Sequence, residues 1–219
     1  MKGTKFGKGV RDGFLALGVT LLVGCAGMGG GHGPGAGHFD TVIVDAGHGG
    51  HDQGARPLRG RGLREKNLTL DTARRLAKSL RSKGFHVMET RTGDYFVPLS
   101  RRTAISNRVP NSVFVSVHYN WARRSRARGV EVYYASLRSR RMAANTLREL
   151  LRAYPAANRG IKTARFYVLR HNERPAILCE MGFLSNARDN SYMQRASTRQ
   201  RLADRIAAGV AAERDGRIP

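Results

Sequence analysis

The sequence predicts a single α/β domain, built as a mostly parallel, twisted sheet flanked by helices. Two patterns predict this class: from residue 40 onward short apolar runs alternate with amphipathic helical patterns, and the first of these runs is continuous and β-branched. The 219 residues are 41% hydrophobic and 25% charged, which suits one globular domain and excludes a wholly disordered or fibrous chain. No repeat of about 20–50 residues is visible.

Each element has its own sequence signal. The run TVIV at 41–44 is typical of a strand buried on both faces. Residues 67–81 place apolar side chains at four-residue spacing with basic side chains opposite, which predicts an amphipathic helix that Gly84 ends. Apolar runs predict further strands at 85–88, 113–117, 130–134, 166–169 and 176–179. Helical patterns predict helices over 138–151 and 199–212, and one that ends near 104–108, before Pro110.

The first 24 residues have the pattern of an export signal. A basic segment precedes an apolar run at 14–23 that is too short to span a bilayer, and the run ends in Leu22-Val23-Gly24-Cys25, which resembles a bacterial lipobox. We therefore expect a lipoprotein signal peptide over 1–24 and lipidation of Cys25. This implies a membrane attachment in the cell envelope, at the periplasmic face of the outer membrane if the organism is diderm. An ordinary signal peptide cleaved near Ala26 is the alternative.

The segment after this signal predicts a tether followed by one folded domain. Residues 25–39 are rich in glycine and lack a hydrophobic pattern, as in a flexible linker. The folded domain then covers residues 40–219. If Cys25 carries lipid, Cys179 has no cysteine partner, and its apolar surroundings indicate a small buried side chain rather than a catalytic thiol.

The net charge of +23 indicates a polyanionic partner. Nucleic acid is the first candidate, but the basic runs contain no interleaved aromatic residues, no helix-turn-helix is recognisable, and an exported protein would not meet the chromosome. We therefore expect no nucleic-acid partner. The anionic polymers of the envelope fit the charge better.

Polar side chains with metal-binding capacity follow three of the predicted strands. His48 comes after the strand at 41–44, His118 after 113–117 and Glu180 after 176–179. Since ligands of open parallel sheets bind beyond the carboxyl ends of the strands, we expect these side chains to converge, with Glu65 at the start of a helix pointing back toward them. Two imidazoles and a carboxylate make an open zinc site, and a second, unligated glutamate suits proton transfer in hydrolysis.

Several blocks of the sequence also carry a family resemblance. They are VDAGHGG at 44–50 with Asp52, Glu65-Lys66-Asn67, Thr90-Arg91-Thr92, SVHYN at 116–120, GVEVYY at 129–134 and EMGFLSN at 180–186. From about residue 41 to about residue 214 the chain resembles the zinc-dependent N-acetylmuramoyl-L-alanine amidases of the Amidase_3 type. The resemblance implies a Zn²⁺ held by His48, Glu65 and His118, with Glu180 as catalytic carboxylate. It implies hydrolysis of the amide between N-acetylmuramic acid and L-alanine in peptidoglycan.

Residues near His118 are candidates for substrate contacts. Asn120 and Trp121 are expected to contact substrate, although a turn role for Asn120 and a partly buried anchor role for Trp121 stay open. The run RRSRAR at 123–128, which includes Arg123 and Arg124, lies next to the expected crevice. With Arg56, Arg59, Arg61 and Arg64 it suggests a cationic rim that holds the anionic wall polymer; a merely solvated face is the alternative.

Two further readings from the residues remain open. One is a catalytically silent, lipid-anchored peptidoglycan-binding protein, which would not need the four site residues. The other is a zinc carboxypeptidase that acts on wall peptides, since the same ligands would serve it. The 61 residues at 119–179 are already used by predicted elements, so no inhibitory helical insertion is expected and no obligatory activator protein is predicted.

Overall fold

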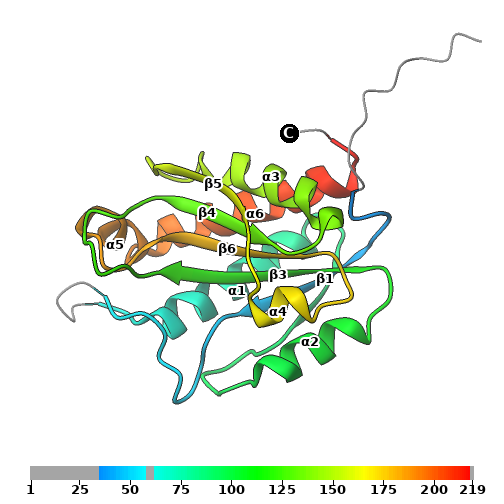
Figure 1. Ribbon diagram of the computed structural model, residues 1–219, viewed down its shortest axis with the longest axis horizontal. Helices are drawn as coiled ribbons and strands as arrows, with labels where there is room; N and C mark the ends of the chain where they lie inside the picture. Colours follow the sequence, from blue (N-terminus) through cyan, green and yellow to red (C-terminus); the bar gives the residue numbers. More distant parts are fainter. Residues whose placement is uncertain (1–34, 58–61, 218–219) are drawn as a thin grey trace, which may run out of the picture. The chain divides into compact units, whose positions relative to one another are not determined.

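A six-stranded sheet in the order β2-β1-β3-β6-β4-β5 forms the centre of the computed structural model, which describes residues 35–57 and 62–217 (Figure 1). The strands are β1 (Thr41–Ala46), β2 (His86–Glu89), β3 (Ser112–Asn120), β4 (Val130–Tyr134), β5 (Asn158–Thr163) and β6 (Ala176–Phe183). The helices are α1 (Glu65–Arg81), α2 (Leu99–Asn107), α3 (Leu137–Leu150), α4 (Tyr167–Arg170), α5 (Ala187–Met193) and α6 (Ala196–Arg214).

The strand directions confirm the predicted fold class. Strands β2, β1, β3 and β6 are mutually parallel. Strand β4 pairs antiparallel with β6, and the edge strand β5 runs parallel to β4. The sheet is therefore mostly parallel, with its last two strands reversed.

The two faces of the sheet are covered unequally. Helices α1, α3 and α6 pack on one face over the larger apolar core, which contains Val44, Val115 and Cys179 (Figure 1). Helices α2 and α4 cover the other face over a smaller core that includes Ile43 and Phe114. Since side chains alternate along a strand, Asp45, Ser116, His118, Glu180 and Glu131 share this second face with Ile43 and Phe114.

The strand predicted at 166–169 is wrong. These residues enter the short helix α4, with Phe166 as its extended N-cap residue. Val168 and Leu169 are adjacent in sequence and both buried in the smaller core, which a helical turn permits and an alternating strand on a half-open surface does not. The strand in this region is β5, whose polar sequence NRGIKT carries no apolar run because it lies at the sheet edge.

The remaining predicted elements are present with shifted ends. The strand at 130–134 matches β4, and the helix predicted over 67–81 begins two residues earlier at Glu65. Helix α5 is not among the predicted elements. The signal peptide at 1–24, Cys25 and most of the tether lie outside the described residues, and within these no helix is long and apolar enough to cross a membrane.

Candidate metal centre and active-site cleft

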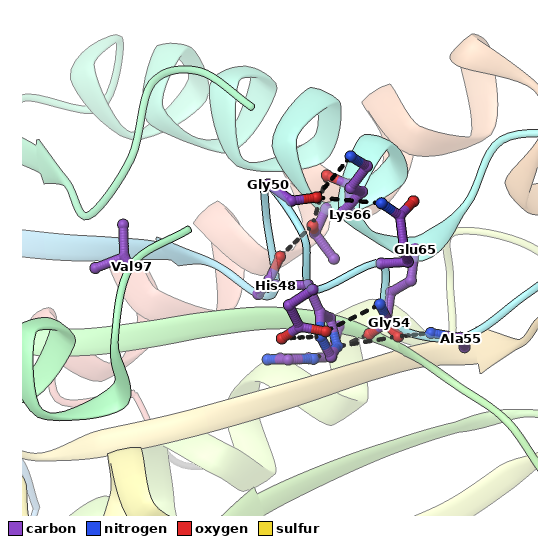
Figure 2. Close-up of polar contacts among 12 residues, drawn as sticks. His48, Gly50, Gly54, Ala55, Glu65, Lys66 and Val97 are labelled. Carbon is purple, nitrogen blue, oxygen red and sulfur yellow. Dashed lines mark hydrogen bonds and ion pairs between the residues drawn. The ribbon is translucent and has the colours of Figure 1, made fainter. Parts of the chain in front are cut away.

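Three elements bring His48, Glu65 and His118 together. His48 follows β1, Glu65 is the first residue of α1, and His118 lies near the end of β3. One potential ligand atom from each lies within 4.8 Å of the others. His48 Nε2 is 3.1 Å from Glu65 Oε2, and His118 Nδ1 is 3.0 Å from Glu65 Oε1 (Figure 2). Two imidazole nitrogens therefore face one carboxylate.

Glycines leave the space that this cluster needs. A Cβ atom on Gly47 would overlap the imidazole of His118, and one on Gly54 would come 2.6 Å from Glu65 Oε2 and 2.7 Å from His48 Cδ2. His48 itself has a φ of 61°, a left-handed conformation that is uncommon outside glycine. The turn after β1 is thus shaped around the cluster.

Backbone amides fix the orientation of the Glu65 carboxylate. Ala55 N donates to Oε2 at 2.6 Å and Tyr119 N donates to Oε1 at 3.0 Å. Burial by itself would raise the pKa of Glu65, but the hydrogen bonds and charges of His118 and His48 outweigh it and lower this pKa. The buried carboxylate is therefore the anionic centre of the cluster.

Asp52 holds the far side of His48. Its Oδ2 lies 2.9 Å from His48 Nδ1. Although burial lowers the pKa of His48, the hydrogen bonds and charges of Glu65 and Asp52 outweigh it and raise that pKa. With Nδ1 bonded to Asp52, Nε2 is the nitrogen directed to the cluster, which is how a carboxylate orients a metal-binding histidine.

Glu180 lies beside His118 on the next strand. The two residues are register partners across β3 and β6, and on the other side Glu180 is the register partner of Glu131 in β4. Glu180 Oε2 is buried and has no hydrogen-bond partner among the described residues. Burial, followed by the negative charges of Glu65 and Glu131, raises the pKa of Glu180 well above its ordinary value. An unpaired carboxyl group is thus held next to the histidine cluster.

Glu131, in contrast, is fully paired. It is 2% exposed and accepts hydrogen bonds from Asn120 Nδ2 at 2.7 Å, Tyr133 Oη at 2.9 Å and Arg159 Nε at 2.7 Å. Lys162 Nζ lies a further 2.5 Å from its Oε2. These partners outweigh burial and lower the pKa of Glu131, so two neighbouring carboxyl groups have opposite shifts.

Asp45 does not orient a ligand side chain, nor does its carboxylate cap the loop. It is buried on the second sheet face and accepts from Thr90 Oγ1 at 2.6 Å, Ser116 Oγ at 2.7 Å and Arg102 Nη1 at 2.6 Å. Burial would raise its pKa, but Arg102 and the two hydroxyl groups lower it. Asp45 therefore belongs to a buried network directly before the His48 turn.

All of these groups open into one cleft of about 810 Å³. Its polar side is lined by the histidine cluster, Asp52, Arg56 and Glu180, and its apolar side by exposed residues of three segments. The apolar residues that are both exposed and cleft-lining are Phe96, Leu99, Trp121, Phe166 and Tyr167. A concave site with a few converging polar groups is the usual form of an enzyme active site.

Comparisons with known proteins decide the family. Residues 42–212 match the Amidase_3 family, described as N-acetylmuramoyl-L-alanine amidase. The chain belongs to this amidase family. It is 34% identical over 170 residues to the probable cell wall amidase LytH of Staphylococcus epidermidis, an alignment that covers 78% of this chain and 57% of that protein. The chain thus spans little more than half the length of this curated relative.

Solved amidase structures share the fold. The catalytic domain of CwlV, an N-acetylmuramoyl-L-alanine amidase from Bacillus (Paenibacillus) polymyxa, is 31% identical with a TM-score of 0.77, over 81% of this chain and 99% of that chain. The amidase AmiC2 of Nostoc punctiforme is 36% identical with a TM-score of 0.74, over 82% and 97% of the two chains. The α/β architecture is therefore that of amidase catalytic domains.

The structure of this amidase-family chain separates the expected substrate contacts. Asn120 and Trp121 line the cleft, but Asn120 uses its amide to bind Glu131 and accepts from Trp121 N at 2.7 Å. Arg123 and Arg124 are exposed in the loop after Trp121 and do not line the cleft. Arg56 lines it, Arg64 is exposed, and Arg59 and Arg61 lie outside the described residues. Substrate contact by these side chains stays a prediction.

Sequence reasoning missed several residues of the amidase cleft. Asp52 had a signal in its position four residues after His48, within the same motif block. Glu131 also lies in a quoted block, GVEVYY, but nothing in the sequence shows that its strand joins β6. Phe166 and Tyr167 were hidden by the wrong strand prediction.

Proposed function

We propose that the protein hydrolyses the amide bond between N-acetylmuramic acid and L-alanine in peptidoglycan, with Zn²⁺ held by His48, Glu65 and His118. The observation that carries this proposal is the meeting of these three ligand atoms within 4.8 Å, with the unpaired carboxyl group of Glu180 on the neighbouring strand. Membership of the amidase family supports the same reaction.

The donor set fits zinc. Two imidazoles and one carboxylate are a common ligand set of catalytic zinc, and they leave a further position free for water or substrate. The Asp52 contact to His48 and the amide bonds to Glu65 supply the outer hydrogen bonds that such ligands require. A carboxylate between two histidines also needs a positive charge, which a divalent cation would provide.

The chemistry divides between the metal and Glu180. A zinc ion held at this site would supply Lewis-acid chemistry, which activates water near neutral pH and polarises the amide carbonyl. Glu180 takes the proton of the attacking water at Oε2, the oxygen that has no other partner, and passes it to the departing nitrogen of L-alanine. Asp52 keeps the ring of His48 oriented throughout.

The test is a digestion of purified peptidoglycan with the full chain, with and without chelator, followed by analysis of the products. We expect stem peptides with a free L-alanine amine, lost on chelation and restored by zinc. Muropeptides shortened at their carboxyl ends would instead identify a carboxypeptidase, and binding without any cleavage would identify a silent wall-binding protein. The digestion contains no second protein, so activity would also support the absence of an obligatory activator.

We also propose that the enzyme works in the cell envelope, attached through lipid on Cys25. The lipobox-like sequence before Cys25 supports this location. Mass spectrometry of the protein purified from membranes tests it: acylated Cys25 at a new N-terminus is expected, and cleavage near Ala26 without acylation would contradict it.

A further inference from the structure

The apolar side of the cleft is aromatic and exposed. Phe96, Trp121, Phe166 and Tyr167, here called the aromatic wall, all line the cleft and are 39–55% exposed. They come from the segment before α2, the end of β3 and the start of α4. Exposed aromatic side chains gathered in one cleft are typical of ligand-binding surfaces, because water solvates their faces poorly.

The rings of the aromatic wall are held in place by neighbouring side chains. Phe166 packs edge-on against Tyr133 with ring centroids 5.0 Å apart, and Tyr167 stacks on His171 at 4.0 Å. Phe96 lies 4.2 Å from the ring of His51. Rings that are already positioned lose little conformational entropy when a ligand packs on them.

The contacts of Phe166 place it on the Glu180 side of the cleft. Tyr133, on which Phe166 packs, donates to Glu131, and Glu131 is the register partner of Glu180. The start of α4 is therefore joined to the catalytic strand by a short, continuous series of contacts.

The charge in the cleft lies elsewhere. Among the described residues that line it, Arg56 is the one cation without a carboxylate partner, since Arg102 is paired with Asp45. Arg56 follows Ala55, whose amide binds Glu65, so this guanidinium lies on the α1 side of the metal centre. A substrate with one anionic half and one neutral, ring-shaped half would match this division.

We propose that the aromatic wall binds the pyranose rings of the glycan, while the carboxylate-bearing stem peptide extends toward Arg56. The inference rests on the proposed function, because it assigns the two halves of the same substrate to two sides of the cleft. Pyranose rings present C–H faces that pack on aromatic rings, and they carry no charge to be repelled by Glu180 and Glu131.

The kinetic test compares two substrates that share the scissile amide. One is an N-acetylmuramoyl peptide and the other is the D-lactoyl peptide, which lacks the sugar ring. In Phe166→Leu and Tyr167→Leu, which keep apolar bulk but lose the ring face, we expect the ratio of kcat/KM for the two substrates to fall about three- to tenfold. Leu137→Ala is the control, because Leu137 is 68% exposed on α3 and does not line the cleft.

A binding test is independent of turnover. Trp121 is the one tryptophan of the chain and lies in the aromatic wall, so its fluorescence reports on this surface. We expect an N-acetylglucosamine oligomer without peptide to change Trp121 emission in Glu180→Gln, with a dissociation constant about three- to tenfold higher when Phe166→Leu is added. Circular dichroism checks that each variant is folded.

The outcomes separate the two proposals. If the unaltered protein cleaves neither substrate, the proposed function fails, while the fluorescence titration still tests the glycan site. If cleavage occurs but the substrate ratio is the same in all variants, or if the oligomer leaves Trp121 emission unchanged, the assignment of glycan to the aromatic wall is overturned.

Discussion

Arg102 Nη1 lies 2.6 Å from Asp45 Oδ1, and the side chains are 3% and 1% exposed. The same guanidinium donates to the carbonyl oxygens of Ala46 at 2.6 Å and His48 at 2.7 Å. A second buried arginine, Arg91, donates to Gly47 O at 2.8 Å. Two guanidinium groups therefore bind three successive carbonyls of the turn that carries His48, and the Asp45–Arg102 pair anchors that turn to the sheet.

Arg102→Met should lower the free energy of unfolding by about 3–5 kcal/mol, because it leaves Asp45 as a buried, unpaired charge. Urea denaturation measures this change. Arg101→Met is the matched control: Arg101 is exposed on the same helix, and its loss should cost less than about 0.5 kcal/mol. Equal effects of the two substitutions would show that the buried pair does not stabilise the turn.

The same pair predicts a dependence of stability on acid. The pKa of Asp45 is lowered below its ordinary value of 3.8, so its contribution is fully present above that pH and is lost as the pH falls through the lowered pKa. Asp45→Asn lacks this contribution at every pH. The difference in unfolding free energy between the two proteins should therefore narrow below about pH 4, at up to ~1.4 kcal/mol per pH unit. Urea denaturation across a pH series would contradict this if the difference stayed constant.

Gly54→Ala should weaken zinc binding, because the added Cβ would press on Glu65 Oε2 and His48 Cδ2. Gly84→Ala is the matched control: its φ of 83° is also left-handed, as is the 62° of Gly54, but its Cβ would meet nothing within 4 Å. Both should lose about 1–2 kcal/mol of stability through backbone strain. Only Gly54→Ala should lower the affinity measured by competition with a zinc chelator; a parallel loss in Gly84→Ala would argue against a steric cause.

Glu180→Gln should reduce kcat by about 10²–10⁴-fold, since the amide cannot take up the proton of the attacking water. Zinc affinity should stay unchanged because Glu180 is not among the three clustered ligands. Stability should not fall, because the substitution removes a buried carboxyl oxygen that has no partner. Glu173→Gln, at an exposed position before β6, is the control for loss of one negative charge. Retained turnover in Glu180→Gln would rule out its role as base.

The loop between β3 and β4, residues 121–129, presents exposed arginines from a fixed backbone. Asn186 Nδ2 binds Ser125 O at 2.7 Å, and Gly129 N donates to Asp189 at 2.7 Å. Within the described chain no ion pair involves Arg123 or Arg124. Their charges are thus available to an anionic polymer.

Replacing Arg123 and Arg124 together with Gln should weaken sedimentation with purified sacculi at low salt, with a difference that shrinks as salt screens the charges. The control is the double replacement of Arg138 and Arg140 with Gln, which removes the same charge from exposed positions on α3. Equal weakening by both pairs would mean that total charge, rather than this loop, determines binding to the wall.

The sequence was sufficient for the α/β class and for the set of residues at the metal centre. Apolar runs of β-branched residues mark buried strands regardless of their neighbours, and His48, His118 and Glu180 each follow such a run directly. It was insufficient where local pattern and tertiary environment disagree. Residues 166–169 are apolar because two of them enter the smaller core and two line the cleft, and periodicity does not distinguish this from a buried strand.

Partnerships between distant segments were decided only by the tertiary structure. Strand order places Glu131 beside Glu180, although 48 residues separate them along the chain, and packing of α2 brings Arg102 to Asp45. The net charge illustrates the same division. The sequence fixes its sign and size, but only the fold pairs Arg102 inside the protein and leaves Arg56, Arg123 and Arg124 exposed, because pairing depends on which carboxylates come within reach.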